Sequence, residues 1–242
     1  MKALGAYTLF LLKLVKQTER FSIYVHRTFE EGVKLGTSSI VIVTIVSTFI
    51  GAVTCIQASY NLIGSWVPNY VVATVLRDMF LPELAPTILS VVLAGKVGSN
   101  IAGELGTMKI TEQVDALEVM GINSASYLVL PKVIASLITF PALVIISATM
   151  GLSGGYAAGR IAGVITTQEF LQGIQSTFDP YIITFFMTKA VVFAFLISTI
   201  SSFKGYSTEG GALQVGQSST AAVTNSCIAI LIADYILADI ML

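Results

Sequence analysis

"GTSSIVIVTIVSTFIGAVTCIQASY", residues 36–60, decides the fold class because it holds no charged side chain from one end to the other. A helix that crosses a bilayer needs about 20 predominantly apolar residues. Charge is absent from Lys34 to Arg77, and again from Lys132 to Arg160 and from Glu209 to Asp234. These stretches predict an all-α, polytopic membrane protein.

The composition supports this prediction. Of 242 residues, 55% are hydrophobic and 11% are charged, and the charged share is about half of what soluble domains carry. A soluble fold would need far more polar residues to cover such apolar stretches. The net charge of −1 and the absence of a basic patch give no indication of nucleic-acid binding.

We expect five transmembrane helices, separated by turn signals such as "GSWVPN", "TFDPY" and "GYSTEGG". A segment broken by Pro68 and Pro82 should separate the first two spans, and Pro141 should kink the third. The expected spans are 36–60, 84–105, 130–158, 181–203 and 216–238.

Residues 1–34 mix cations with Leu, Phe, Tyr and Val. An apolar stretch at 3–12 is followed by renewed charge rather than by small residues, unlike a signal peptide. This mixture predicts an amphipathic helix lying in the membrane interface, followed by a transmembrane domain over 35–242. The lone histidine, His26, is expected to be solvated or interfacial.

The distribution of cations predicts the orientation. With the N-terminus in the cytoplasm, the outer segments hold only Arg77 and Arg160. The inner segments then hold Lys2, Lys13, Lys16, Arg20, Arg27, Lys34, Lys109, Lys132 and Lys204. We therefore expect the loops at 106–129 and 203–215 to be cytoplasmic.

The loop at 111–122, "TEQVDALEVMGI", should form a short amphipathic helix over about 111–121. Thr111 is its expected N-cap and Gly121 its end. A helix this short needs a surface to lie on, and anionic lipids would repel a face with three carboxylates. A cytoplasmic protein partner suits it better. The carboxylates are Glu112, Asp115 and Glu118, and the apolar residues between them are Val114, Leu117 and Met120.

Two stretches closely resemble the MlaE family, the permease subunits of ABC transporters that work with MCE proteins to move phospholipids. The first is "ELAPTILSVVLAGKVGSNIAGELGTMKITEQVDALEVMGINSASYLVLPKVIA" and the second is "FKGYSTEGGALQVGQSSTAAVTNSCIAILIADY". The likeness covers roughly residues 35–240. It implies a permease of the bacterial inner membrane that binds phospholipid, with an MCE protein on its periplasmic side and sometimes a STAS-domain subunit.

The resemblance also implies that the short cytoplasmic helix is a coupling helix that docks on a separate ATPase subunit. Its contact residues would be Glu112, Asp115, Leu117, Glu118 and Met120. Because ABC ATPases act in pairs, the permease is expected to be a homodimer. The chain has no G-x-x-x-x-G-K-[ST] motif, since "LAGKVGS" lacks the first glycine and the final Ser or Thr. We therefore expect no ATP hydrolysis, cofactor or metal in this subunit, and we expect Cys55 and Cys227 to be small buried apolar residues.

"GLSGG", residues 151–155, fits the G-x-S-x-G pattern of serine hydrolases. An intramembrane protease would need a base beside Ser153, and His26 lies outside the spans. Gly151, Gly155 and Gly159 instead follow the small-xxx-small pattern of closely packed membrane helices.

Charges inside spans are costly and are functional candidates. Glu83 opens the second span where the family usually has Arg-Glu-x-Gly-Pro, but Pro82 stands in place of the arginine. Lys189 matches a family lysine near the lipid pocket and is expected to pair with Glu83 or to hold a lipid phosphate. Lys96 replaces a family arginine and is expected to brace Glu104 or Asp234. The remaining substrate-binding candidates are aromatic residues at the outer end of the first span, Tyr60 and Trp66, whose simpler role is interface anchoring.

Two other function classes remain open from the residues alone. A secondary transporter would show inverted repeats and paired broken helices, and five spans do not divide evenly. A channel would have a polar line along one span, and none stands out. Both stay as alternatives, for another hydrophobic solute, and the intramembrane protease is a remote one.

Overall fold

The computed structural model describes residues 2–15, 21–62 and 68–241, and within them the chain is helical with no strand. Five helices are long and apolar enough to cross a membrane, which confirms the predicted class. The elements are α1 (Lys2–Val15), α2 (Phe21–Leu62), α3 (Tyr70–Met79), η1 (Phe80–Leu84), α4 (Ala85–Leu93), η2 (Ala94–Gly98), α5 (Ser99–Ile110), α6 (Gln113–Val119), α7 (Ser124–Ile161), α8 (Thr167–Gln175), α9 (Tyr181–Tyr206) and α10 (Ala212–Met241).

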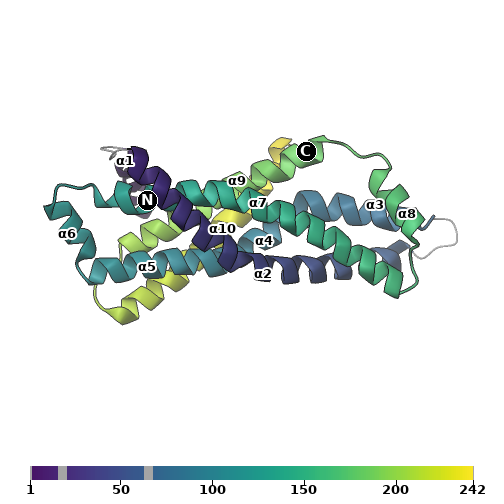
Figure 1. The fold of residues 1–242 in the computed structure, drawn as a ribbon, viewed down its shortest axis with the longest axis horizontal. Coiled ribbons are helices and arrows are strands. Elements are labelled where there is room, and N and C mark those ends of the chain that lie inside the picture. Colours follow the sequence, from purple (N-terminus) through teal and green to yellow (C-terminus); the bar gives the residue numbers. More distant parts are fainter. Residues whose placement is uncertain (1, 16–20, 63–67, 242) are drawn as a thin grey trace.

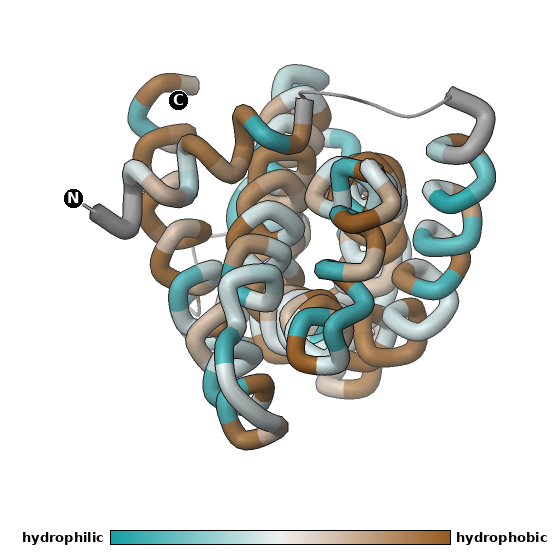
Figure 2. The backbone as a smooth tube through the Cα atoms, turned by 90° about the vertical axis from the view of Figure 1, so that its left-hand side faces the viewer, coloured by the Kyte–Doolittle hydropathy of each residue, from teal (hydrophilic) through white to brown (hydrophobic). Residues whose placement is uncertain are grey.

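The helices run along one long axis, with α1 and α6 at one end and α3 and α8 at the other (Figure 1). Figure 2 looks from the end that carries α1 and α6, and it shows hydrophobic residues recurring along the long helices. From the positive-inside rule we expect this to be the cytoplasmic end. The opposite end is called the outer end below.

The second span begins earlier than the sequence predicts. Helical structure is continuous from Tyr70 to Ile110, so Pro82 does not separate a loop from a helix. Pro82 lies instead in the π-helical turn η1, where the wider turn accommodates a residue that has no N–H and whose ring would clash with a preceding carbonyl.

The first long helix also begins earlier than the sequence predicts, since α2 runs without a break from Phe21. Only Lys2–Val15 forms the separate N-terminal helix α1. The charged turns of α2 are accommodated by other helices: Arg27 stacks 3.9 Å from the ring centre of Tyr127, and Lys132 on α7 lies 2.7 Å from Glu31.

The centre of the bundle is the contact between α2 and α7. Gly51, Gly151 and Gly154 lie where a Cβ atom would meet the opposite backbone or the Phe80 ring. The hydroxyl of Ser47 donates to that of Ser147 across the same contact at 2.7 Å. This agrees with the predicted small-residue packing. Helix α7 continues through Pro131 and Pro141 as one element.

Arg77 was expected in an outer loop, but it lies on α3 with 1% of its surface exposed. Its Nη1 donates to the carbonyl oxygens of Ile174 at 2.7 Å and Ser176 at 2.6 Å, at the C-terminal end of α8. Its Nε donates to Asp78 at 2.8 Å. Carbonyls at a helix C-terminus attract cations, so Arg77 fastens α8 to the second span.

Candidate functional site

Three charged side chains meet inside the bundle, on three different spans. Lys189 of α9 is fully buried, and its Nζ lies 2.7 Å from Oε2 of Glu83 on η1 and 2.7 Å from Oδ1 of Asp234 on α10. A lysine in an apolar interior requires such partners, because its ammonium would otherwise lose its hydration without compensation. We call Glu83, Lys189 and Asp234 the charged triad.

Local structure places each member of the triad. Thr87, one helical turn beyond Glu83, donates to Asp234 at 3.0 Å. Phe185, one turn before Lys189, sets its ring 4.5 Å from the ammonium, a cation–π distance. The triad thus ties the second, fourth and fifth spans together.

The triad carries two carboxylates and one ammonium, so its formal charge is −1 when all three are ionised. Lys189 is enclosed, whereas 40% of the Glu83 side chain is exposed. The exposed charged group of the triad is therefore the Glu83 carboxylate, not the Lys189 ammonium. Lys189 pairs with Glu83, which was one of its two expected partners, the other being a lipid phosphate. Its second contact is the Asp234 carboxylate.

Asp234 was missed as a partner of Lys189, since it was considered only as one of two possible partners of Lys96, beside Glu104. The available signal was that Asp234 ends the charge-free stretch after Glu209 inside an apolar helix. Tyr60 lies near the outer end of α2 with an exposed side chain and makes no hydrogen bond to the triad. Trp66 falls outside the described residues.

The predicted short helix between the second and third spans is present as α6, Gln113–Val119. Its N-cap is Glu112, in a left-handed conformation with φ 60°. Thr111 was expected to be the N-cap, but its hydroxyl donates back to Thr107 on α5 at 2.8 Å. At the other end the amides of Gly121 and Ile122 donate to Glu118 and Leu117, the Schellman arrangement that a glycine with positive φ permits.

Two of the three α6 carboxylates bind partners within the chain. Asp115 lies 2.7 Å from Lys109 of α5, and Glu118 lies 3.3 Å from Lys13 of α1. Glu118 also accepts hydrogen bonds from Ser124 at 2.9 Å and Tyr206 at 3.0 Å. These hydroxyls, Ser124 first, and the Lys13 ammonium lower the pKa of Glu118, because each stabilises the ionised carboxylate.

The surface that α6 leaves open differs from the one expected. Val114 is fully buried and Leu117 is partly buried, whereas Met120 and the neighbouring Val119 are exposed, Val119 by 89%. Glu112 is exposed as well. Val119 was not singled out from the sequence because, at 3.6 residues per turn, it falls on the carboxylate face, between Asp115 and Glu112. Glu112 at the N-cap, Val119 in the last turn and Met120 at the C-cap are thus open to contact from outside.

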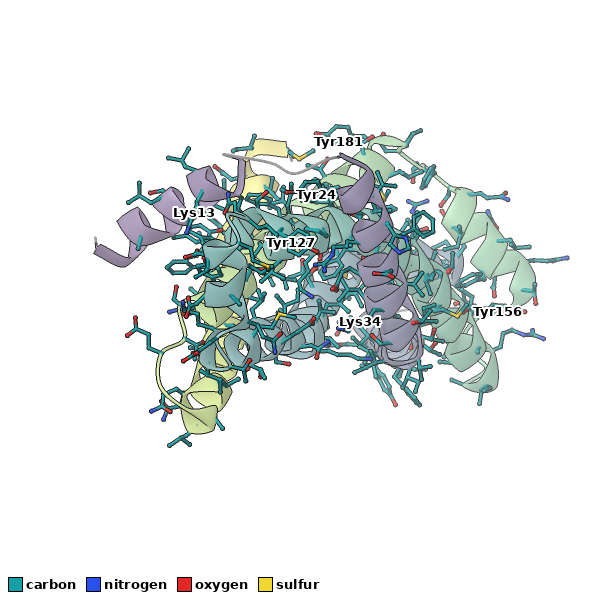
Figure 3. The ribbon with its side chains drawn as sticks, turned by 60° about the vertical axis from the view of Figure 1, so that its left-hand side comes forward. Lys13, Tyr24, Lys34, Tyr127, Tyr156 and Tyr181 are labelled. Atoms are coloured by element: carbon teal, nitrogen blue, oxygen red, sulfur yellow. The ribbon has the colours of Figure 1, made fainter. Side chains whose placement is uncertain are left out.

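A second ion cluster lies towards the end of the spans that carries α1 and α6. Lys132 on α7 is buried and bridges Glu31 of α2 at 2.7 Å and Glu104 of α5 at 3.0 Å. Lys34 of α2 lies 3.0 Å from the same Glu104 oxygen. Figure 3 shows Lys34 on α2 and Lys13 on α1. Lys96 contacts neither Glu104 nor Asp234, contrary to expectation; its ammonium donates to the backbone carbonyl of Ser38.

Ser153 of the hydrolase pattern and His26 do not form a catalytic pair. The hydroxyl of Ser153 is exposed and donates to Met150 of its own helix at 2.8 Å. His26 lies 3.2 Å from Glu30 on α2. Across residues 2–15, 21–62 and 68–241, no three His, Cys, Asp or Glu side chains are grouped to hold a metal ion.

Comparison with known sequences gives consistent matches. Residues 28–240 match the sequence model of the family described as Permease MlaE. A probable ABC transporter permease protein of Rickettsia bellii is 36% identical over 239 residues, which covers 99% of this chain and 92% of the relative. A probable ABC transporter permease protein of Synechocystis is 35% identical over 88% of this chain and 81% of its own length.

A plant protein is also similar. The chloroplastic protein TRIGALACTOSYLDIACYLGLYCEROL 1 of Arabidopsis thaliana is 35% identical over 219 residues, covering 90% of this chain and 62% of the plant protein. Its name contains that of a diacylglycerol lipid.

Proposed function

This chain belongs to the MlaE family of ABC transporter permeases, and we propose that it moves phospholipids between the bacterial inner membrane and an MCE-domain protein, driven by a separate ATPase subunit. In this proposal it acts as a homodimer, with one ATPase beneath each α6 and the MCE protein at the outer end. A STAS-domain subunit is compatible with this arrangement.

The observation that carries the lipid assignment is the charged triad. The carboxylate of Glu83 is partly exposed, and the buried Lys189, which also contacts Asp234, holds it in place. A phospholipid site needs an apolar surface with one or two fixed polar groups that orient the headgroup. Glu83 is the group that faces the headgroup, and Lys189 and Asp234 hold it in place. Tyr60 and Trp66 would line the outer rim.

The lipid assignment is tested by replacing Lys189 with alanine. Its removal leaves Glu83 and Asp234 facing each other without a cation, and breaking a buried ion pair costs about 3–5 kcal/mol. We expect the variant to reach the membrane but to retain less phospholipid after purification in mild detergent, as measured by lipid mass spectrometry. Full phospholipid retention together with a destabilised dimer would assign the triad a bracing role alone.

The ATPase assignment is tested at the open surface of α6. Charge reversal at Glu112, Asp115 and Glu118 together would also break the internal contacts of the last two. Val119→Glu with Met120→Glu changes only exposed side chains. We expect the wild-type chain, purified from its native membrane, to bring with it a subunit carrying a nucleotide-binding G-x-x-x-x-G-K-[ST] motif. The double variant should lose that subunit while remaining folded, and normal co-purification would contradict the coupling role.

A further inference from the structure

A hollow with many polar residues in its lining opens at the cytoplasmic end of the spans, apart from the charged triad. Its volume is about 880 Å³, and α2, η2, α5 and α10 contribute to its lining. The side chains used below are Lys34, Lys96, Asn100, Glu104 and Ser219. Lys34 is labelled on α2 in Figure 3.

The charges around this hollow do not balance. Glu31 and Glu104 are matched by Lys132 and Lys34, which lie within 3.0 Å of them. Lys96 is left as an additional cation. Within the described part of the chain, no carboxylate lies within ion-pair distance of its ammonium.

The ammonium of Lys96 is only partly satisfied. It has three N–H donors, and one of them donates to the neutral carbonyl of Ser38. The side chains of Asn100, one turn further along, and of Ser219 on α10 also line the hollow. Neither makes a hydrogen bond to another described residue, so both are available as donors beside Lys96.

The depth of the hollow suggests what it binds. Lys96 follows Glu83 by about 20 Å of helix, and it lies towards the end that carries α1 and α6. Because the hydrocarbon core of a bilayer is about 30 Å thick, we expect the headgroups of the inner leaflet near this level. A lysine at this boundary can extend its ammonium to the headgroup level, where phospholipids carry phosphate, and ammonium–phosphate hydrogen bonds are among the stronger ones.

We propose that this hollow binds a phosphate group through Lys96, Asn100 and Ser219, carried either by an inner-leaflet phospholipid or by free phosphate. The single negative charge of a phosphodiester neutralises the additional cation. The site goes beyond the transport site around Glu83, since one lipid headgroup cannot reach both. It would hold a second lipid on the cytoplasmic side.

The test measures how fast each lysine of the purified full-length chain reacts with an amine-acylating reagent in nanodiscs, read out by mass spectrometry. One set of nanodiscs contains phosphatidylglycerol and the other an uncharged, phosphate-free glycolipid. Lys204 is the internal control, since it lies near the same end on α9, is similarly half-buried and has no ion-pair partner among the described residues. We expect phosphatidylglycerol to slow acylation of Lys96 about tenfold relative to Lys204, as a charge-assisted hydrogen bond would.

The source of the phosphate is decided by adding millimolar inorganic phosphate to the glycolipid nanodiscs. Protection of Lys96 there identifies free phosphate as a ligand, and protection by phosphatidylglycerol alone identifies the lipid. The proposal is overturned if Lys96 reacts as fast as Lys204 in all three conditions. It is also overturned if Lys96 is equally slow in all three, because protein would then be covering it.

A photoreactive group on the phosphatidylglycerol headgroup gives an independent measurement. Cross-links to the stretch 96–104 should fall in Lys96→Gln but persist in Lys204→Gln. Lys189→Ala should lower phospholipid retention at the outer transport site but leave the protection of Lys96 unchanged. The proposal for the transport site and the proposal for this hollow can therefore fail independently.

Discussion

Arg77 shows at the scale of one residue how this bundle uses a buried charge. Its guanidinium reaches the carbonyl oxygens that close α8, and the Asp78 carboxylate balances its charge. Hydrogen bonds that involve a charged group are worth about 1.5–3 kcal/mol each. Arg77 therefore holds α8 against the second span more firmly than the apolar contacts of α8 would do alone.

Arg77→Met is expected to release α8 because the carbonyls of Ile174 and Ser176 lose their donor. The free energy of unfolding should fall by about 2–4 kcal/mol. Amide hydrogen exchange over residues 167–176 should accelerate more than exchange in α7. Arg160→Met is the matched control, since Arg160 is exposed near the same end without an ion pair among the described residues. Unchanged protection of α8 in the Arg77 variant would show that apolar packing suffices.

The ion pairs were predictable from the sequence only in part. Lys189 and Glu83 are intramembrane charges of opposite sign at similar depth, so their pairing was one of the expected outcomes. The partners of Arg77 on α8 are backbone carbonyls, which leave no trace in the residue types of 174 and 176. Lys96 and Asp234 were mispaired because position along a helix gives depth but not direction around the axis.

At the scale of elements, the contact of α2 with α7 depends on residues without side chains. Glycine costs up to about 1 kcal/mol in a helix relative to alanine, so replacing Gly154 by alanine would stabilise α7 in isolation. In the bundle, however, the added Cβ would overlap the backbone of Thr48. A backbone cannot move aside as a flexible side chain can, so the clash outweighs the gain in propensity.

Gly154→Ala is therefore expected to destabilise the protein by about 1–3 kcal/mol, the usual range for overpacking, and to lower its thermal midpoint. Ser153→Ala, one position away, alters an exposed hydroxyl that bonds only to its own helix. It should change stability by less than about 0.5 kcal/mol and leave lipid transport intact. A large transport loss specific to the Ser153 hydroxyl would favour the hydrolase reading.

The boundaries of elements were harder to predict than their number. Five apolar stretches predict five spans, because hydrophobic length is a direct property of sequence. The break expected at Pro82 is absent because a π-helical turn accommodates that proline. Residues 21–34 were assigned to the interfacial segment from their charges, yet Glu31 and Lys34 have partners on α5 and α7 that only the fold brings near.

In the molecule as a whole, a single ion pair relates the position of the N-terminal helix to that of the proposed coupling helix. Lys13 of α1 lies 3.3 Å from Glu118 of α6, so the N-terminal helix and the proposed coupling helix share one end of the bundle. Helix α8 lies at the opposite end (Figure 1). From the excess of cations around α1 and α6, we expect α6 in the cytoplasm and α8 on the outer side.

Membrane topology is tested by cysteine labelling in spheroplasts that express the chain. Cys55 and Cys227 are first replaced by alanine, and a single cysteine is placed at Ala116 on α6 or at Gln172 on α8, both of which are exposed. A maleimide that cannot cross the membrane should label Gln172→Cys in intact spheroplasts. It should label Ala116→Cys only after the membrane is permeabilised, because α6 faces the cytoplasmic ATPase in the proposed transporter. The reverse pattern would place α6 outside the cell, where no ATPase could reach it, and would remove the basis for coupling and for an inner-leaflet phosphate site together.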